Sequence, residues 1–219
     1  MFKIAAATLL ALGLAMPAVA EITAIRAGRV ITDAAQPARG ASTILVENGR
    51  IIEINDAAAA LPAGAKVIDL SGKTVMPGLI DAHVHLTGTP DSQFWQEAVT
   101  TDEYSVAVGL ANAATTLRAG FTTVRDLGSG RLSGFAVRDA IANGIATGPR
   151  TLVSGPAISI IGGHGDVSGY RPEVNAALAM GNTCTGAEQC AARFREASRA
   201  GADVIKITAT GGVLSYAKS

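Results

Sequence analysis

The stretch that decides the fold is "VMPGLIDAHVHLTG", residues 75–88. An apolar run leads into His83 and His85, which are one residue apart, and Thr87–Gly88 follow directly. The chain has only three histidines in 219 residues, so two of them at the end of a strand-like run need an explanation. Because side chains alternate between the two faces of a strand, this spacing predicts that Asp81, His83 and His85 point the same way.

Two imidazoles on one strand face favour a metal site. Side chains two positions apart on a strand are about 7 Å apart, so both rings can converge on one ion near the strand end. Histidine is a common ligand of zinc and similar ions. The alternative is a pair of satisfied core histidines. Gly88 follows the pair closely and marks the end of the strand-like run. Functional sites of parallel β/α folds lie at the carboxyl ends of strands, so this position favours the metal site.

Strand-like and helix-like segments alternate from Gly78 onward. The apolar, strand-like segments are 79–86, 120–128, 150–159 and 202–212. Helical patterns cover 100–120, 134–144 and 186–201, and the first of these has Thr101 or Asp102 as its cap and Gly120 as its stop. This alternation predicts an α/β fold built from β/α units with parallel strands.

Residues 21–76 predict a small all-β unit that Pro77–Gly78 closes. Strands are expected over 22–32 and 42–55, and Asn48–Gly49 between apolar alternations predicts a type I′ hairpin. A further strand pair is expected around Ser71–Gly72.

Residues 1–20 have the pattern of a secretory signal peptide. Lys3 supplies the positive charge, Ile4–Met16 is apolar, and Ala18–Val19–Ala20 fits a cleavage site. A buried N-terminal helix is the alternative. The pattern predicts a secreted, periplasmic protein whose mature chain starts near Glu21, with no membrane anchor.

The net charge is +0 and basic blocks are absent, which argues against a nucleic-acid partner. Cys184 and Cys190 could form a local disulfide in an oxidising compartment or could be two buried thiols, and their spacing alone does not decide between these.

Lys206 interrupts the β-branched run "DVIKITAT". A strand-end lysine that reaches solvent along its stem is one interpretation. The other begins with desolvation, which favours the neutral amine. A neutral amine can act as a base, act as a nucleophile, or add CO2 to become a carbamate that bridges two metal ions.

Two glycine-rich segments follow strand-like runs. His164 in "ISIIGGHGDVSGY" is either an exposed loop histidine or a side chain that faces substrate. Gly128, Gly130 and Gly134 suggest a nucleotide-binding loop, but their spacing is not GxGxxG. Arg125–Asp126 before this loop is expected to form an ion pair in or beneath the site.

Several motifs together resemble one family. "MPGLIDAHVHL" resembles the first-strand metal motif of the amidohydrolase superfamily. The later segments "AGFTTVRDLG", "GPRTLVSG" and "GADVIKITATGGVLS" resemble its imidazolonepropionase-like and Xaa-Pro dipeptidase-like branch. The likeness covers essentially the whole chain after the signal peptide.

The resemblance implies a (β/α)8 TIM barrel with a β-sandwich built from both chain ends. His83 and His85 would bind the more buried of two divalent ions, usually zinc, and Lys206 would be a carboxylated lysine that bridges them. A metal-bound hydroxide would attack the amide or peptide carbonyl of a dipeptide or another N-acyl amide. His164 would lie near this small-molecule substrate.

The chain departs from the family pattern. The family takes two further histidine ligands and a catalytic aspartate from later strands, so no catalytic residue is assigned here. The expectation is an N-terminal fragment, inactive by itself: signal peptide 1–20, part of a β-sandwich 21–76, and the first four β/α units 77–219. It could form a homo-oligomer. The competing hypothesis is a non-catalytic, secreted metal-binding or relic β/α protein.

Overall fold

The computed structural model describes residues 21–212, so the expected signal peptide lies outside the described residues. The chain divides into two compact units, one ending at Pro77 and the other beginning at Gly78. Within residues 21–212, no helix is both long enough and apolar enough to cross a membrane.

The first unit is built on a four-stranded sheet with the order β3-β2-β1-β4. Its strands are β1 (Ile22–Val30), β2 (Ser42–Glu47), β3 (Arg50–Asp56) and β4 (Lys66–Val75). β1 runs antiparallel to β2 and parallel to β4. Ala27, Val30 and Ile44 form the buried core of this unit.

The turn predictions for this unit have different outcomes. Asn48 and Gly49 between β2 and β3 have φ angles of 50° and 73°, and both are positive, as a type I′ hairpin requires. The strand pair predicted around Ser71–Gly72 is wrong, because β4 runs through both residues. The register between β1 and β4 shifts between Ala27 and Arg29. Ser71 and Gly72 therefore lie beside an irregularity of the sheet and not in a turn.

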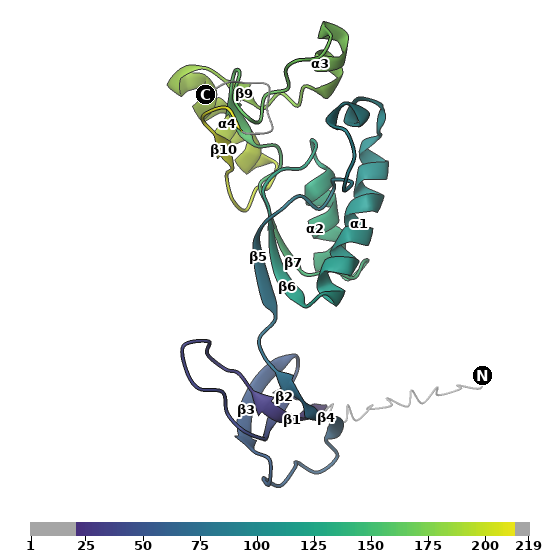
Figure 1. Cartoon of the computed structure of the whole chain (residues 1–219), viewed down its shortest axis with the longest axis vertical. Coiled ribbons are helices and arrows are strands. Elements are labelled where there is room, and N and C mark those ends of the chain that lie inside the picture. The colour runs from purple at the N-terminus through teal and green to yellow at the C-terminus, as the bar shows by residue number, and fades with distance from the viewer. Residues whose placement is uncertain (1–20, 213–219) are drawn as a thin grey trace, which may run out of the picture. The chain divides into compact units, whose positions relative to one another are not determined.

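The second unit begins with a parallel sheet of order β5-β6-β7. Its elements are β5 (Leu79–Val84), α1 (Asp102–Arg118), β6 (Phe121–Asp126), α2 (Ser133–Ala142) and β7 (Arg150–Val153). Both helices lie on the same side of the sheet (Figure 1). Leu86, Ala113, Val124 and Val137 form the buried core between sheet and helices.

Helix α1 begins and ends where the sequence predicts. Thr101 is the N-cap, and its side chain accepts a hydrogen bond of 3.3 Å from the backbone N–H of Tyr104. Gly120 follows the helix with a φ of 99°, a left-handed conformation that glycine adopts without strain.

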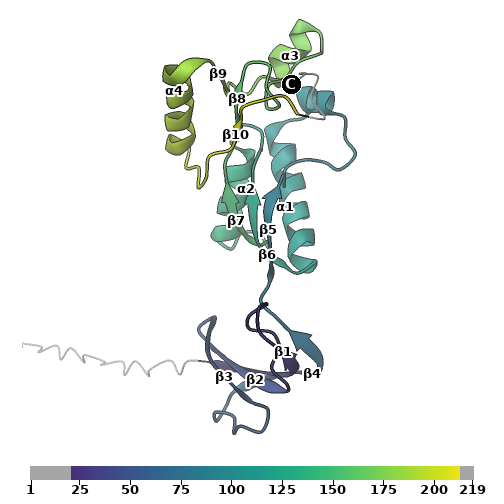
Figure 2. The ribbon, with the colours of Figure 1, turned by 60° about the vertical axis from the view of Figure 1, so that its left-hand side comes forward.

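The rest of this unit holds a second parallel sheet of order β10-β8-β9. Its strands are β8 (Ile158–Ile160), β9 (Thr183–Cys184) and β10 (Ile207–Thr208). The remaining helices are the 3-10 helix η1 (Phe94–Val99), α3 (Pro172–Leu178) and α4 (Gly186–Arg199). α4 packs beside β8 and β9, and α3 contacts η1 (Figure 2).

Two predicted strands are shorter than expected. The segment 150–159 is split into β7 and β8, because Gly155 adopts a φ of 68° and Pro156 follows it. In 202–212 only Ile207–Thr208 forms a strand. This segment still lies beside both parts of the split strand, since the N–H of Asp203 donates to the carbonyl of Val153 and the N–H of Ile158 donates to the carbonyl of Lys206, both at 2.9 Å.

Cys184 and Cys190 form a disulfide with a Cα–Cα distance of 5.0 Å. The sequence left a disulfide and two free thiols open, and the structure has the disulfide. The bond joins β9 to the first turn and a half of α4, so it fixes this helix against the end of the second sheet.

Replacing both cysteines with serine should lower the free energy of unfolding by about 2 kcal/mol, the value expected for closing so short a loop. Urea unfolding followed by circular dichroism measures this change. Reductant should lower the midpoint of the native protein to that of the double variant and leave the variant unchanged. Equal midpoints for all samples would show that the disulfide contributes no stability.

Candidate functional site

The residues singled out by the sequence line one cavity of ≈ 710 Å³ in the second unit. His83 is in β5 and His85 directly follows it, His164 follows β8, and Lys206 directly precedes β10. Among the described residues, no group of three His, Cys, Asp or Glu side chains could hold a metal ion. Any metal site in this cavity would therefore need Lys206 or further ligands beside the two histidines.

The two histidines of "DAHVHL" face each other closely. Their ring centroids are 5.2 Å apart and the ring planes meet at 63°. Nδ1 of His85 lies 2.8 Å from the carbonyl oxygen of Gly128, in the loop after β6. Partial burial lowers the pKa of His83 below its ordinary value, and the positive charge of Lys206 adds to this effect. This direction favours the neutral ring, the form in which histidine binds metals.

Lys206 is half-buried and lines the same cavity. No ion pair joins its ammonium group to a carboxylate of the part of the chain that the structure describes. Lys206 thus lines the cavity beside the two histidines without a carboxylate partner, which is the placement that the functional interpretations require.

The shared face predicted for Asp81, His83 and His85 is formed only by the two histidines, which line the cavity that Asp81 does not line. The register between β5 and β6 shifts between Asp81 and Val84, so simple alternation fails there. Oδ1 of Asp81 instead accepts a 3.0 Å hydrogen bond from the backbone N–H of His83. The carboxylate of Asp81 is therefore hydrogen-bonded to the local backbone.

The ion pair predicted between Arg125 and Asp126 is also wrong. Nε of Arg125 donates to the carbonyl oxygen of Ala82 at 2.8 Å. Asp126 is 0% exposed and accepts hydrogen bonds from the backbone N–H groups of Leu86 (2.9 Å) and Gly128 (3.1 Å). Burial raises the pKa of Asp126, and these two hydrogen bonds act in the opposite direction. Neighbouring strand residues point to opposite faces, which is why these two do not pair.

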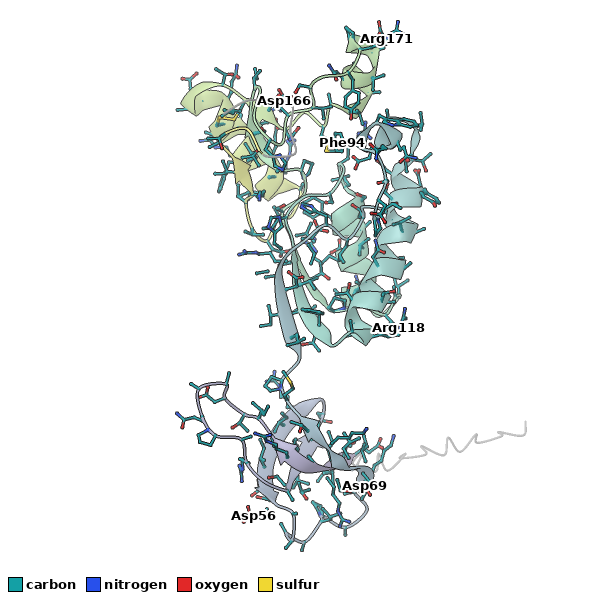
Figure 3. All side chains as sticks on the ribbon, viewed as in Figure 1. Asp56, Asp69, Phe94, Arg118, Asp166 and Arg171 are labelled. Atoms are coloured by element: carbon teal, nitrogen blue, oxygen red, sulfur yellow. A yellow bond between two sulfur atoms is a disulfide. The ribbon has the colours of Figure 1, made fainter. Side chains whose placement is uncertain are left out.

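No sequence pattern marks the other residues that line the cavity as site residues. They include Phe94, Glu97, Arg131, Asp166 and Tyr170. Figure 3 shows Phe94 and Asp166 in the same half of the unit as Arg171. Burial raises the pKa of Glu97, and the nearby His85 opposes this. NH1 of Arg131 lies 3.2 Å from Oδ1 of Asp102, and both residues line the cavity.

The glycines that suggested a nucleotide loop have packing explanations. A side chain at Gly128 would collide with the ring of His85. One at Gly134 would collide with Ser129 and Val153. Close approach therefore accounts for both glycines without a phosphate.

Comparison with known proteins assigns the family. The profile of the Amidohydrolase family matches residues 74–219, so the chain belongs to the amidohydrolase family. Ochratoxinase of Aspergillus niger is 32% identical over 90% of this chain and 44% of its own length. A dihydroorotase of Geobacter sulfurreducens is 44% identical over 41% of this chain and 20% of its own length.

A solved structure is similar to most of this chain. The crystal structure of a Xaa-Pro dipeptidase with methionine bound in its active site has a TM-score of 0.76 and 31% identity. The match covers 91% of this chain and 50% of that chain. This chain thus spans about half the length of the ochratoxinase and of the dipeptidase. The predicted fold, part of a TIM barrel preceded by part of a β-sandwich, is confirmed.

Proposed function

We propose that the protein is a metal-dependent hydrolase that cleaves the amide bond of a dipeptide or another N-acyl amide. The observation that carries this proposal is the single cavity lined by His83, His85, His164 and Lys206. Membership of the amidohydrolase family and the likeness to an ochratoxinase and a Xaa-Pro dipeptidase support it. Since the chain spans about half of these relatives, the activity is proposed for the whole protein.

The cavity residues fit a metal centre chemically. His83 and His85 would hold the more buried of two divalent ions, with zinc the first candidate. Lys206 would bridge the ions as a carbamate: its neutral amine forms a bond to the carbon of CO2 and releases one proton. The ions would polarise the substrate carbonyl and make water a nucleophile at neutral pH.

Two further side chains would bind and orient the substrate. His164 lies in the loop after β8 and lines the cavity, where it would hold the substrate near the scissile carbonyl. Arg131 presents a guanidinium to the same cavity, and only its NH1 is engaged by Asp102. A guanidinium binds carboxylates in two-point geometry, so we propose a substrate with a free carboxylate next to the cleaved bond.

The proposal includes the cellular compartment in which the protein acts. The pattern of residues 1–20 favours export, so a small amide in the periplasm is the expected substrate.

Dialysis against a chelator should abolish hydrolysis of N-acyl amino acids and dipeptides, and added zinc should restore it. The loss should exceed about a hundredfold, since a catalytic metal contributes several kcal/mol to the transition state. A panel of matched substrates with and without the terminal carboxylate, followed by amine release, measures both claims. Hydrolysis that survives the chelator would refute metal dependence. Bound zinc without turnover of any substrate would favour the metal-binding, non-catalytic alternative.

A further inference from the structure

We propose that residues 125–128, the sequence "RDLG" after β6, act as a clamp that positions the histidine pair and selects the nitrogen of His85 that faces the cavity. Arg125, Asp126 and Gly128 are positioning residues in this inference. Its functional consequence rests on the proposed metal site, but its geometry does not.

The clamp first holds the irregular part of β5. Nε of Arg125 donates to the carbonyl oxygen of Ala82 at 2.8 Å, at the point where the register between β5 and β6 shifts. The N–H of Leu127 donates to the carbonyl oxygen of Val84 at 3.0 Å. The carbonyl groups on both sides of His83 are thus fixed by one short segment. Irregularities of this kind re-aim side chains next to functional sites.

Asp126 then joins the two loops that follow β5 and β6. Its Oδ2 accepts from the N–H of Leu86, which comes directly after His85, and its Oδ1 accepts from the N–H of Gly128. The side chain is fully buried, so water cannot replace either bond. The distance between the backbone of His85 and the loop after β6 is therefore set by one carboxylate.

Gly128 completes the clamp by contacting the imidazole itself. Its carbonyl oxygen lies 2.8 Å from Nδ1 of His85. A carbonyl can only accept a hydrogen bond, so Nδ1 carries a proton, and in the neutral ring Nε2 then keeps its lone pair. A Cβ atom at Gly128 would lie 2.8 Å from Cε1 and 2.9 Å from Nδ1 of His85, so only glycine allows this contact.

The wild-type ring tautomer is the first test. Three histidines in the chain give three pairs of ring nitrogen signals after selective ¹⁵N labelling, and the variant His85→Gln assigns one pair. In the metal-free protein at neutral pH, His85 should be in the Nδ1–H tautomer. No hydrogen bond joins the ring of His83 to a residue within 21–212, so its signals should show averaging between tautomers. An Nε2–H or averaged His85 would overturn the inference.

Variants of the clamp provide the second test. Gly128→Ala and Asp126→Asn should each abolish the single tautomer of His85. Zinc titrated against the His85 signals should then bind about 10- to 100-fold more weakly, as expected when a ligand loses its supporting partner. In Asp126→Asn the shape is kept, but one acceptor becomes an NH2 group facing a backbone N–H.

Gly130→Ala is the matched control in the same loop. A Cβ atom there would meet only Oγ of Ser133, at 3.9 Å, so the tautomer and the zinc affinity should not change. Equal effects at Gly128 and Gly130, or no effect at Gly128 and Asp126 in folded variants, would refute the clamp. Because the tautomer is read without metal or substrate, its failure and the failure of the proposed hydrolase activity are separate results.

Discussion

His85→Ala should reduce the affinity of the protein for zinc by more than about a hundredfold, and the double variant His83→Ala/His85→Ala should bind no zinc above background. Loss of a supporting hydrogen bond to a ligand already costs about 10- to 100-fold, so loss of the ligand itself should cost more. The two ring centroids lie 5.2 Å apart in one cavity. His85→Ala therefore leaves His83 as the one imidazole of the pair that can bind zinc. Metal content after dialysis and titration calorimetry measure the change.

The third histidine supplies the control. His164 lines the same cavity but follows a different strand, and we assign it to the substrate. His164→Ala should therefore keep its zinc while losing hydrolytic activity. If His164→Ala and His85→Ala lose equal amounts of zinc, the division between metal ligands and substrate-binding residues is wrong.

Local signals in the sequence were sufficient for much of the fold. Helix α1 was predicted between Thr101 and Gly120, because the cap and the stop act within one turn of the helix. The Asn48–Gly49 turn was predicted for the same reason. Both features depend on residues that are neighbours in the chain.

The errors arise where distant residues decide the structure. Asp81 does not share the cavity face of His83 and His85, and the register shift beside it is contacted by the side chain of Arg125, which is 43 residues away from its partner Ala82. The break at Gly155 was visible as glycine before proline, but the apolar residues on both sides favoured one continuous strand. These two errors concern register and strand length, and they leave the order of the predicted β/α elements in the second unit intact.

The candidate site was only partly visible in the sequence. His83, His85 and Lys206 stand out because a strand interior rarely holds such side chains. Glu97 and Arg131 lie on a short 3-10 helix and in a loop, where charged residues are usual. Only the cavity brings them together with the histidines.

Lys206→Met should remove one of two bound metal ions and lower kcat/KM by roughly a thousandfold. Methionine keeps the unbranched apolar stem but has no nitrogen on which a carbamate can form. The loss of one ion should cost several kcal/mol of transition-state stabilisation, which corresponds to about three factors of ten. Metal content and initial rates measure the two effects. In the native protein, removal of dissolved CO2 and bicarbonate before metal loading should cause a similar loss, and their return should reverse it.

Lys73→Met makes the same chemical change at an exposed position of β4 and should alter neither metal content nor rate. If Lys206→Met keeps two ions, the lysine does not bridge them. If it loses activity but keeps both ions, and bicarbonate has no effect on the native protein, the free amine acts on the substrate as a base or nucleophile. Lys206 is half-buried, lines the same cavity as the two histidines and lowers the pKa of His83 by its charge, so we expect the loss of one ion.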